Sequence, residues 1–297
     1  MPYNAAMSQA DVVARSTRGP VTRGWLKRDL EALGVRPGMV LMVHASLSQL
    51  GWVVGGAITA TAALCDALGL PFHLDYAPGQ MPPPAPEAGT LIMPTFSTDN
   101  GEPSNWRHPP VPESWWDTIR HEMPPYDPST APLRMMGRIA EYFMALPGVM
   151  RSSHPGISWT GFGAQAESVL DNHSLDMCLG EDTPSGRCYE LGGYVLSLAT
   201  VRTTVLHLAE YRAEYPAKTI GNYAAALRAN GKRRWMKYQD VKGDDEDFEQ
   251  LRQDFMKAHL PTENTWREGE VAYSTSRLFA IRPLIDFAVK WMEEHRK

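Results

Sequence analysis

Apolar residues near the start of the chain follow two spacings, one typical of a helix and one typical of a buried strand. From Trp25 to Leu33 they recur every three or four residues, after Thr22, which can cap a helix, and before Gly34, which can end one. The next apolar run, VLMVHA at 40–45, is short and continuous, as in a strand buried on both faces. We therefore predict a helix and then a buried strand.

The same two patterns alternate towards the C-terminus. Helical spacing covers residues 57–68, 138–146, 164–170, 203–215 and 284–295, and strand-like runs cover 90–96, 194–200, 218–240 and 266–282. Because strands alternate with helices, we predict an α/β fold around a mixed, largely parallel sheet. The chain shows no internal repeat and no clear linker. We expect a loose N-terminal leader over residues 1–20 and a single domain over residues 21–297.

Two proline-rich segments interrupt this alternation. Residues 71–87 hold six prolines and are expected to form an exposed insertion. Residues 97–133 are also rich in proline, but they contain three tryptophans, which favour an ordered segment. Because a long irregular segment inside a compact domain usually serves function, we expect residues 97–133 to contribute to a binding site.

Composition and charge narrow the function classes. Hydrophobic residues make up 43% of the chain and charged residues 21%, which is ordinary for a globular protein. A net charge of -5 without a basic stripe argues against a nucleic-acid partner and favours a cationic ligand. No apolar run reaches the length of a membrane span or signal peptide, so we expect a cytoplasmic protein without a membrane partner. Three cysteines without a CxxC pair argue against a disulfide framework and a structural zinc site.

The segment TTVLHLAEYRAEY at 203–215 carries the main candidate for chemistry. Thr203 or Thr204 can cap a helix there, which would place His207 in its first turn, near the positive end of the helix dipole. That field disfavours an imidazolium ion and keeps the ring a neutral base. Glu210 lies three residues on, on the same helix face. A histidine with only a structural role is the alternative.

The segment VHASLSQLGWVVGG at 43–56 is the candidate cofactor loop. A strand runs into small residues, and a Gly55–Gly56 pair precedes the next helix, whose free backbone amides at Ala57 can hold a pyrophosphate. The segment matches neither GxGxxG nor GxxxxGK[ST], so a simple turn is the alternative.

Four segments together resemble one known family. VHASLSQLGWVVGG, GTLIMPTFS, RSSHPGISWTGFG and TTVLHLAE occur in the order and at separations found in the aminoglycoside 3-N-acetyltransferase (antibiotic N-acetyltransferase) family, and the resemblance spans roughly residues 22–290. It implies a three-layer α/β/α fold. It also implies direct attack of the 3-amino group of an aminoglycoside on the thioester of acetyl-CoA, without a metal, and hence antibiotic resistance.

The resemblance assigns roles to several residues. The histidine of the family's T-x-x-H motif falls on His207 as general base, and its threonine falls on Thr204, whose hydroxyl can contact the thioester oxygen or the leaving sulfur. A carboxylate about thirty residues later completes the set, and Asp240 is the best match. The CoA-binding candidates near the cofactor loop and at a later helix start are His44, Ser46, Leu47, Ser48, Gly55, Gly56, Ala57 and Arg138.

A polycationic aminoglycoside-like acceptor needs ionised carboxylates, and we assign Asp99, Glu113 and Glu210 to it. His44 has a buried structural role as its alternative, and His154 is expected to shape a substrate loop. Three other functions stay open: a metal-dependent hydrolase, a non-enzymatic binder, and an acetyltransferase with a different acceptor amine. The absence of HExxH and HxH disfavours the hydrolase. The sequence leaves the oligomeric state open, a homodimer being one option.

Overall fold

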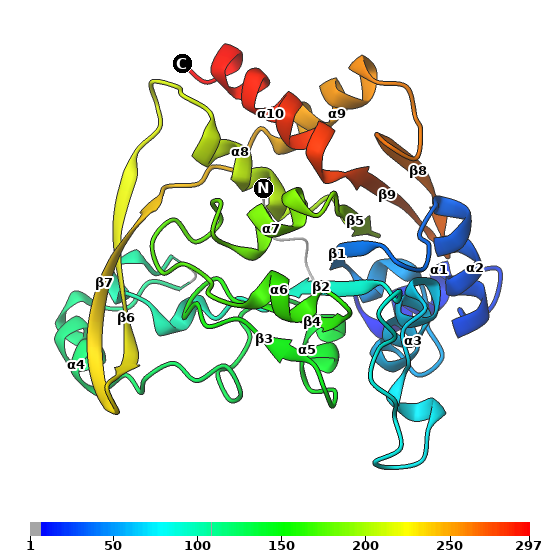
Figure 1. The fold of residues 1–297 in the computed structure, drawn as a ribbon, viewed down its shortest axis with the longest axis horizontal. Coiled ribbons are helices and arrows are strands. Elements are labelled where there is room, and N and C mark those ends of the chain that lie inside the picture. Colours follow the sequence, from blue (N-terminus) through cyan, green and yellow to red (C-terminus); the bar gives the residue numbers. More distant parts are fainter. Residues whose placement is uncertain (1–6, 108) are drawn as a thin grey trace.

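A seven-stranded sheet forms the centre of the computed structural model, which describes residues 7–107 and 109–297 (Figure 1). The strands follow the order β3-β4-β2-β1-β5-β9-β8. They are Val40–Ala45 (β1), Thr90–Pro94 (β2), Met150–Arg151 (β3), Trp159–Gly163 (β4), Tyr194–Leu198 (β5), Trp266–Val271 (β8) and Ser274–Ala280 (β9). Two further strands, Ile220–Ala229 (β6) and Lys232–Val241 (β7), form a separate antiparallel hairpin.

Parallel pairing is confined to the middle of the sheet. Strand β1 pairs in parallel with β2 and with β5, whereas the pairs β2–β4, β3–β4, β5–β9 and β8–β9 are antiparallel. The predicted mixed sheet is confirmed, but its parallel part is smaller than expected. Parallel neighbours need a long crossover, which helix α3 (Ala57–Leu68) supplies between β1 and β2. The two-residue turn between β8 and β9 permits only an antiparallel pair.

Side chains on the two faces of the sheet enter separate hydrophobic cores. Leu41 and Val43 of β1 belong to one core, and Val40 and Met42 belong to the other, because successive residues of a strand point to opposite faces. The first face is covered by α2 (Arg23–Leu33), α3 and α5 (Arg138–Met144). The second face is covered by α6 (Ala166–Leu170), α7 (Pro184–Glu190), α8 (His207–Arg212), α9 (Phe248–Ala258) and α10 (Ile281–His295). The predicted three-layer architecture is confirmed.

Near the N-terminus, the structure confirms the predicted start of one helix and adds a helix that was not predicted. The Thr22 hydroxyl accepts a hydrogen bond of 3.2 Å from the amide of Trp25 and so starts α2 as predicted. The predicted loose leader is wrong for its described part, because residues Gln9–Arg15 form helix α1. Ser8 and Asp11 cap each other's backbone there in a capping box, which stabilises so short a helix. Residues 1–6 of the predicted leader lie outside the described residues.

The proline-rich segment 97–133 packs against the β6–β7 hairpin (Figure 1). It contains helix α4 (Trp116–Glu122). The amide of Tyr126 donates to the carbonyl of Ala226 at 2.8 Å, and Nε of Arg233 donates to the carbonyl of Met123 at 2.7 Å. These contacts hold the described parts of the segment, residues 97–107 and 109–133, against the hairpin. No helix in the described ranges is long and apolar enough to cross a membrane.

Candidate active site

The candidate site lies where β1 and β5 end and α8 begins. A 3-10 turn, Thr204–Leu206, leads from the region after β5 into α8, whose first residue is His207. We predicted that Thr203 or Thr204 would cap this helix, but neither hydroxyl does so. The Thr203 hydroxyl instead accepts a hydrogen bond of 3.0 Å from buried Arg252 of α9, which holds the turn against that helix.

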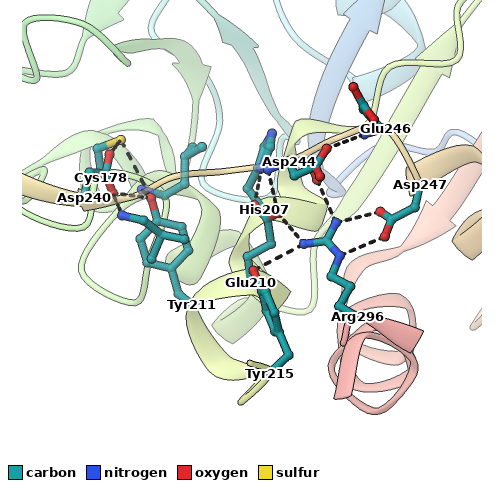
Figure 2. Close-up of polar contacts among 12 residues, drawn as sticks. Cys178, His207, Glu210, Tyr211, Tyr215, Asp240, Asp244, Glu246, Asp247 and Arg296 are labelled. Carbon is teal, nitrogen blue, oxygen red and sulfur yellow. Dashed lines mark hydrogen bonds and ion pairs between the residues drawn. The ribbon is translucent and has the colours of Figure 1, made fainter. Parts of the chain in front are cut away.

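His207 and Glu210 form a closely bonded pair on α8. Nδ1 of His207 lies 2.5 Å from Oε2 of Glu210, and the side chain of His207 is 18% exposed (Figure 2). Because an ionised carboxylate can only accept, Nδ1 carries the proton and Nε2 is the basic ring nitrogen. The phenyl ring of Phe248 packs on the imidazole with centroids 4.8 Å apart. The pair therefore fixes the orientation of the imidazole and leaves Nε2 free of this bond.

Glu210 has a different role from the one predicted. Its side chain is fully buried, and Oε1 accepts hydrogen bonds from the Asp244 amide at 2.8 Å and from Arg296 Nη1 at 2.6 Å. Burial acts to raise the pKa of Glu210, but the bonds from His207 and Arg296 outweigh it and the net pKa lies below the ordinary value. The assignment of Glu210 to acceptor binding is wrong, because both oxygens are occupied inside the protein.

Asp240 does not orient His207, so this part of the predicted triad is also wrong. Its Oδ1 accepts from the Tyr211 hydroxyl at 2.5 Å, and its Oδ2 accepts from the Cys178 thiol at 2.6 Å. Burial raises the pKa of this carboxyl against the opposing hydrogen bonds. Figure 2 shows Asp240 together with Cys178 and Tyr211, apart from His207. Glu210, three residues along the same helix, already occupies Nδ1.

His44 joins the end of β1 to the turn before α8. Its Nε2 accepts a hydrogen bond of 3.2 Å from the amide of Thr204. Burial, followed by the positive charges of Arg202 and Arg252, lowers the pKa of His44 to about 3, so the ring is neutral. Because His44 is buried and bonded to the backbone, the structure favours its structural role over contact with CoA. The His44 bond fixes α8 relative to the sheet.

The predicted cofactor loop begins beside the end of β5. The amide of Ser46 donates to the carbonyl of Leu198 at 3.1 Å, and Leu47–Leu50, which includes Ser48, forms a 3-10 turn. Gly55 and Gly56 adopt φ angles of 74° and 59°, which favour glycine, directly before Ala57 begins α3. Gly56 has no side chain to cap α3, which is compatible with the predicted pyrophosphate site, and this site stays a prediction.

Arg138 begins a second helix near the same edge of the sheet. It follows Gly137, where an added Cβ would lie 3.9 Å from the carbonyl oxygen of Ala45 at the end of β1. The Arg138 side chain is exposed and pairs with Glu141 at 3.1 Å. An exposed guanidinium at this edge is compatible with the predicted phosphate contact, which stays a prediction.

The two acceptor-binding candidates in segment 97–133 are exposed. Asp99 already pairs with Arg134 at 2.9 Å, so an acceptor ammonium would compete with that guanidinium. Glu113 begins a short 3-10 turn. His154, from the RSSHPG motif, is buried, and its Nδ1 accepts from the amides of Gly156 and Ile157, in keeping with the expected loop-shaping role.

The sequence analysis did not identify two residues of the site. Arg296 bonds to Glu210 from beyond the end of α10, and Gly243 lies against the His207–Glu210 pair, 2.9 Å from Nδ1 if a Cβ is added. Both contacts join segments far apart in the chain, and neither residue stands in a motif. Across residues 7–107 and 109–297, no group of three His, Cys, Asp or Glu side chains is arranged to hold a metal.

Known proteins resemble this chain over most of its length. The family model for aminoglycoside 3-N-acetyltransferase matches residues 85–293. The SPbeta prophage-derived aminoglycoside N(3')-acetyltransferase-like protein YokD of Bacillus subtilis is 37% identical over 94% of this chain and 95% of its own. Aminoglycoside N(3)-acetyltransferase VII of Streptomyces paromomycinus is 33% identical over 97% of this chain and 96% of its own.

Solved structures also resemble this chain over nearly its whole length. The crystal structure of YokD matches with a TM-score of 0.85 and 36% identity, covering 96% of this chain and 98% of that one. The structure of AAC-IIIb in a binary complex with CoASH matches with a TM-score of 0.75 and 28% identity, covering 94% of this chain and 98% of that one. With the family model matching residues 85–293 and relatives above 30% identity over nearly the whole chain, this protein belongs to the aminoglycoside 3-N-acetyltransferase family.

Proposed function

We propose that this protein transfers the acetyl group of acetyl-CoA to the 3-amino group of an aminoglycoside, with His207 as general base. The observation that carries the proposal is the bond of 2.5 Å between Nδ1 of His207 and the buried carboxylate of Glu210. It leaves a basic Nε2 at the edge of the sheet where open α/β folds bind ligands. The CoASH complex of AAC-IIIb supports acetyl-CoA as the cosubstrate.

The proposed reaction balances through one proton carrier. An aminoglycoside amine is largely protonated at neutral pH, so the ammonium first releases one proton to solvent and becomes a neutral, nucleophilic amine. Nε2 of His207 accepts a proton from the attacking amine while the N–C bond forms at the thioester carbon. The C–S bond then breaks, and the imidazolium returns the proton to the departing thiolate of CoA. Glu210 stabilises the imidazolium between these steps, as the acid of a triad does.

The cofactor would lie along the edge formed by the predicted loop. We place its pantetheine along Ser46 to Ser48 and its pyrophosphate at the α3 amides after Gly56, with Arg138 near a phosphate. Support comes from the position of Ser46 beside the end of β5 and from the lack of a side-chain cap at the start of α3. The Thr204 hydroxyl remains our candidate for contact with the thioester. Since acetyl-CoA is present in the cytoplasm, we place the reaction there.

The acceptor site would be acidic, as a polycationic substrate requires. Asp99 and Glu113 remain candidates on the rim formed by residues 97–133. A cavity of about 420 Å³ also opens beside Tyr211, which lies four residues after His207 on α8. Its lining includes three carboxylates, Asp176, Glu181 and Asp182, and one ammonium, that of Lys218. Glu181 is already paired with Arg212 at 2.7 Å, so Asp176 and Asp182 are the stronger candidates for binding a cation. We therefore expect antibiotic acetylation, and with it antibiotic resistance in a host that expresses the protein.

Thiol release from acetyl-CoA across a panel of aminoglycosides tests the proposal. We expect His207→Ala to lower kcat by about 10²–10⁴-fold, which is typical for loss of a general base. Glu210→Gln should lower it less, because the base remains but loses its ionised partner. Calorimetric titration with CoA should show unchanged binding to both variants.

Three outcomes would contradict the proposal. His207→Ala at wild-type rate would exclude this base, and thiol release only with other amines would move the acceptor to the non-antibiotic alternative. Absence of turnover with every amine, together with a stoichiometric metal in the purified protein, would favour the hydrolase.

A further inference from the structure

Arg296 connects three parts of the chain behind the His207–Glu210 pair. It follows α10, its side chain is only 8% exposed, and its Nη1 donates to Oε1 of Glu210 at 2.6 Å. Nη2 donates to Oδ1 of Asp247 at 2.6 Å and to the carbonyl of Asp244 at 2.7 Å (Figure 2). One guanidinium therefore joins α10, α8 and the loop 243–247.

The geometry uses the planar fork of arginine. Nε and Nη2 donate to the two oxygens of Asp247 at 2.8 Å and 2.6 Å, and Nη1 extends from the same plane to Glu210. A bidentate pair fixes the orientation of the guanidinium as well as its position. Lysine supplies one point charge and cannot reproduce this set of contacts.

The loop held by Arg296 lies directly on the pair that we assign to catalysis. The Asp244 amide donates to Oε1 of Glu210 at 2.8 Å. The neighbouring Gly243 is so close to His207 that an added Cβ would lie 2.9 Å from Nδ1. Movement of this loop would therefore change both partners of the His207–Glu210 bond.

We propose that Arg296 is a positioning residue for the acetyl transfer: it fixes Glu210 and the loop 243–247 against His207, and its charge opposes protonation of the resting imidazole. This inference rests on the proposed function. Arg296 acts through Glu210 and is not itself a catalytic residue. Its charge and its geometry have separable effects, because charge changes the pH dependence whereas geometry changes the maximal rate.

The sign of the charge effect follows from the groups around His207. Glu210 on α8 and Asp247 on the loop are anions, Arg296 is the cation between them, and His44 from β1 is neutral. The other charged groups on neighbouring elements include Arg202, Arg212, Asp244, Asp245, Glu246, Glu249 and Arg252. Removing the guanidinium leaves Glu210 and Asp247 uncompensated, which favours an imidazolium ion. A higher pH is then needed to obtain the neutral base.

Arg296→Met and Arg296→Lys separate the two effects. For Arg296→Met, we expect kcat at neutral pH to fall by up to about 100-fold, with the acidic limb of the kcat–pH profile displaced to higher pH. The imidazole resonance of His207, assigned by its loss in His207→Ala, should show the same displacement by NMR. Arg296→Lys should lower kcat but keep the limb near its wild-type position.

Arg282→Met is the matched control, because Arg282 lies on α10 but bonds to the carbonyls of Tyr189 and Glu190. It should leave the profile unchanged. Asp247→Asn provides a second variant if Arg296→Met does not fold, and it should displace the limb in the opposite direction, because it removes an anion. A loss of activity without displacement of the limb in Arg296→Met, or in Asp247→Asn where that variant replaces it, would overturn the inference. His207→Ala at full activity would overturn the proposed function instead.

Discussion

Gly243→Ala tests whether the loop beside the catalytic pair is as rigid as its contacts indicate. The new Cβ would lie 2.9 Å from Nδ1 of His207 and 3.1 Å from Oε2 of Glu210, the two atoms joined by the 2.5 Å bond. Carbon and nitrogen atoms in ordinary contact are about 3.5 Å apart. Either the loop or the pair must therefore move by roughly 0.5 Å.

The structure indicates that most of this movement falls on the imidazole. Arg296 binds the Asp244 carbonyl and Asp247, so the loop is held at two points, whereas the partly exposed His207 ring is held by one hydrogen bond, to Glu210, and by packing against Phe248. Catalytic groups must be held within about 0.5 Å of their productive geometry. We expect kcat to fall by roughly 10- to 100-fold.

The remaining properties of the Gly243→Ala variant should change little. Gly243 is exposed, so we expect the free energy of unfolding in urea to differ from wild type by no more than about 1 kcal/mol. The dissociation constant for CoA should be unchanged by calorimetry. Gly24→Ala is the control, because an added Cβ at Gly24 in α2 meets no atom within 4 Å. If Gly243→Ala keeps kcat within twofold of wild type, the loop is not rigid and the reasoning fails.

The other predictions concern acid stability, the Asp240 group and the acceptor. Burial lowers the pKa of His44 and His154 to about 3 and that of His173 to about 4. Unfolded histidines ionise at about 6.5, so the unfolded state binds protons first as the pH falls. The free energy of unfolding should therefore drop between pH ~6.5 and ~4, by ~2 kcal/mol per histidine at pH 5, and equal urea midpoints at pH 7.5 and 5 would contradict this. Asp240→Asn should lower the melting temperature without displacing the kcat–pH profile, since Asp240 bonds to Tyr211 and Cys178; a displacement like that of Glu210→Gln would reinstate it as a partner of His207. Asp99→Asn and Glu113→Gln should weaken acceptor binding and its sensitivity to salt, because salt screens exposed charge pairs; unchanged calorimetric affinities would remove both from the site.

Local patterns predicted the elements that local interactions determine. The helix before β1 has its cap at Thr22 and its end at Gly34, and the strand 40–45 is a continuous apolar run, so all are visible in short windows. Helix α9 was missed because its start, Phe248, directly follows an acidic run that resembles a solvated loop. The smaller share of parallel pairing was also not predictable, since periodicity shows where strands are and not which strands pair.

The site shows the same division between local and distant contacts. His207 and Glu210 lie on one helix face, so their proximity follows from helical spacing, although the role of Glu210 was misassigned. Asp240 was chosen by its separation along the chain, a weaker guide, and its true partners Cys178 and Tyr211 follow only from packing. Arg296 reaches Glu210 from a distant segment, and no short window of sequence contains that contact.

The pairing of β1 with β5 has a consequence for how activity is gained during folding. Leu41 pairs with Tyr194 and His44 pairs with Ser197, so the centre of the sheet joins residues from the two halves of the chain. Forming such non-local pairs costs loop-closure entropy, because distant parts of the chain must be brought together, and this slows the folding of a domain. The hydrogen bond between His44 and Thr204 forms only across this closed pair of strands. Partly folded chains, in which the helices and the local β8–β9 hairpin have already formed, would thus be inactive. The rate at which turnover recovers on refolding would therefore report the rate at which β1 pairs with β5.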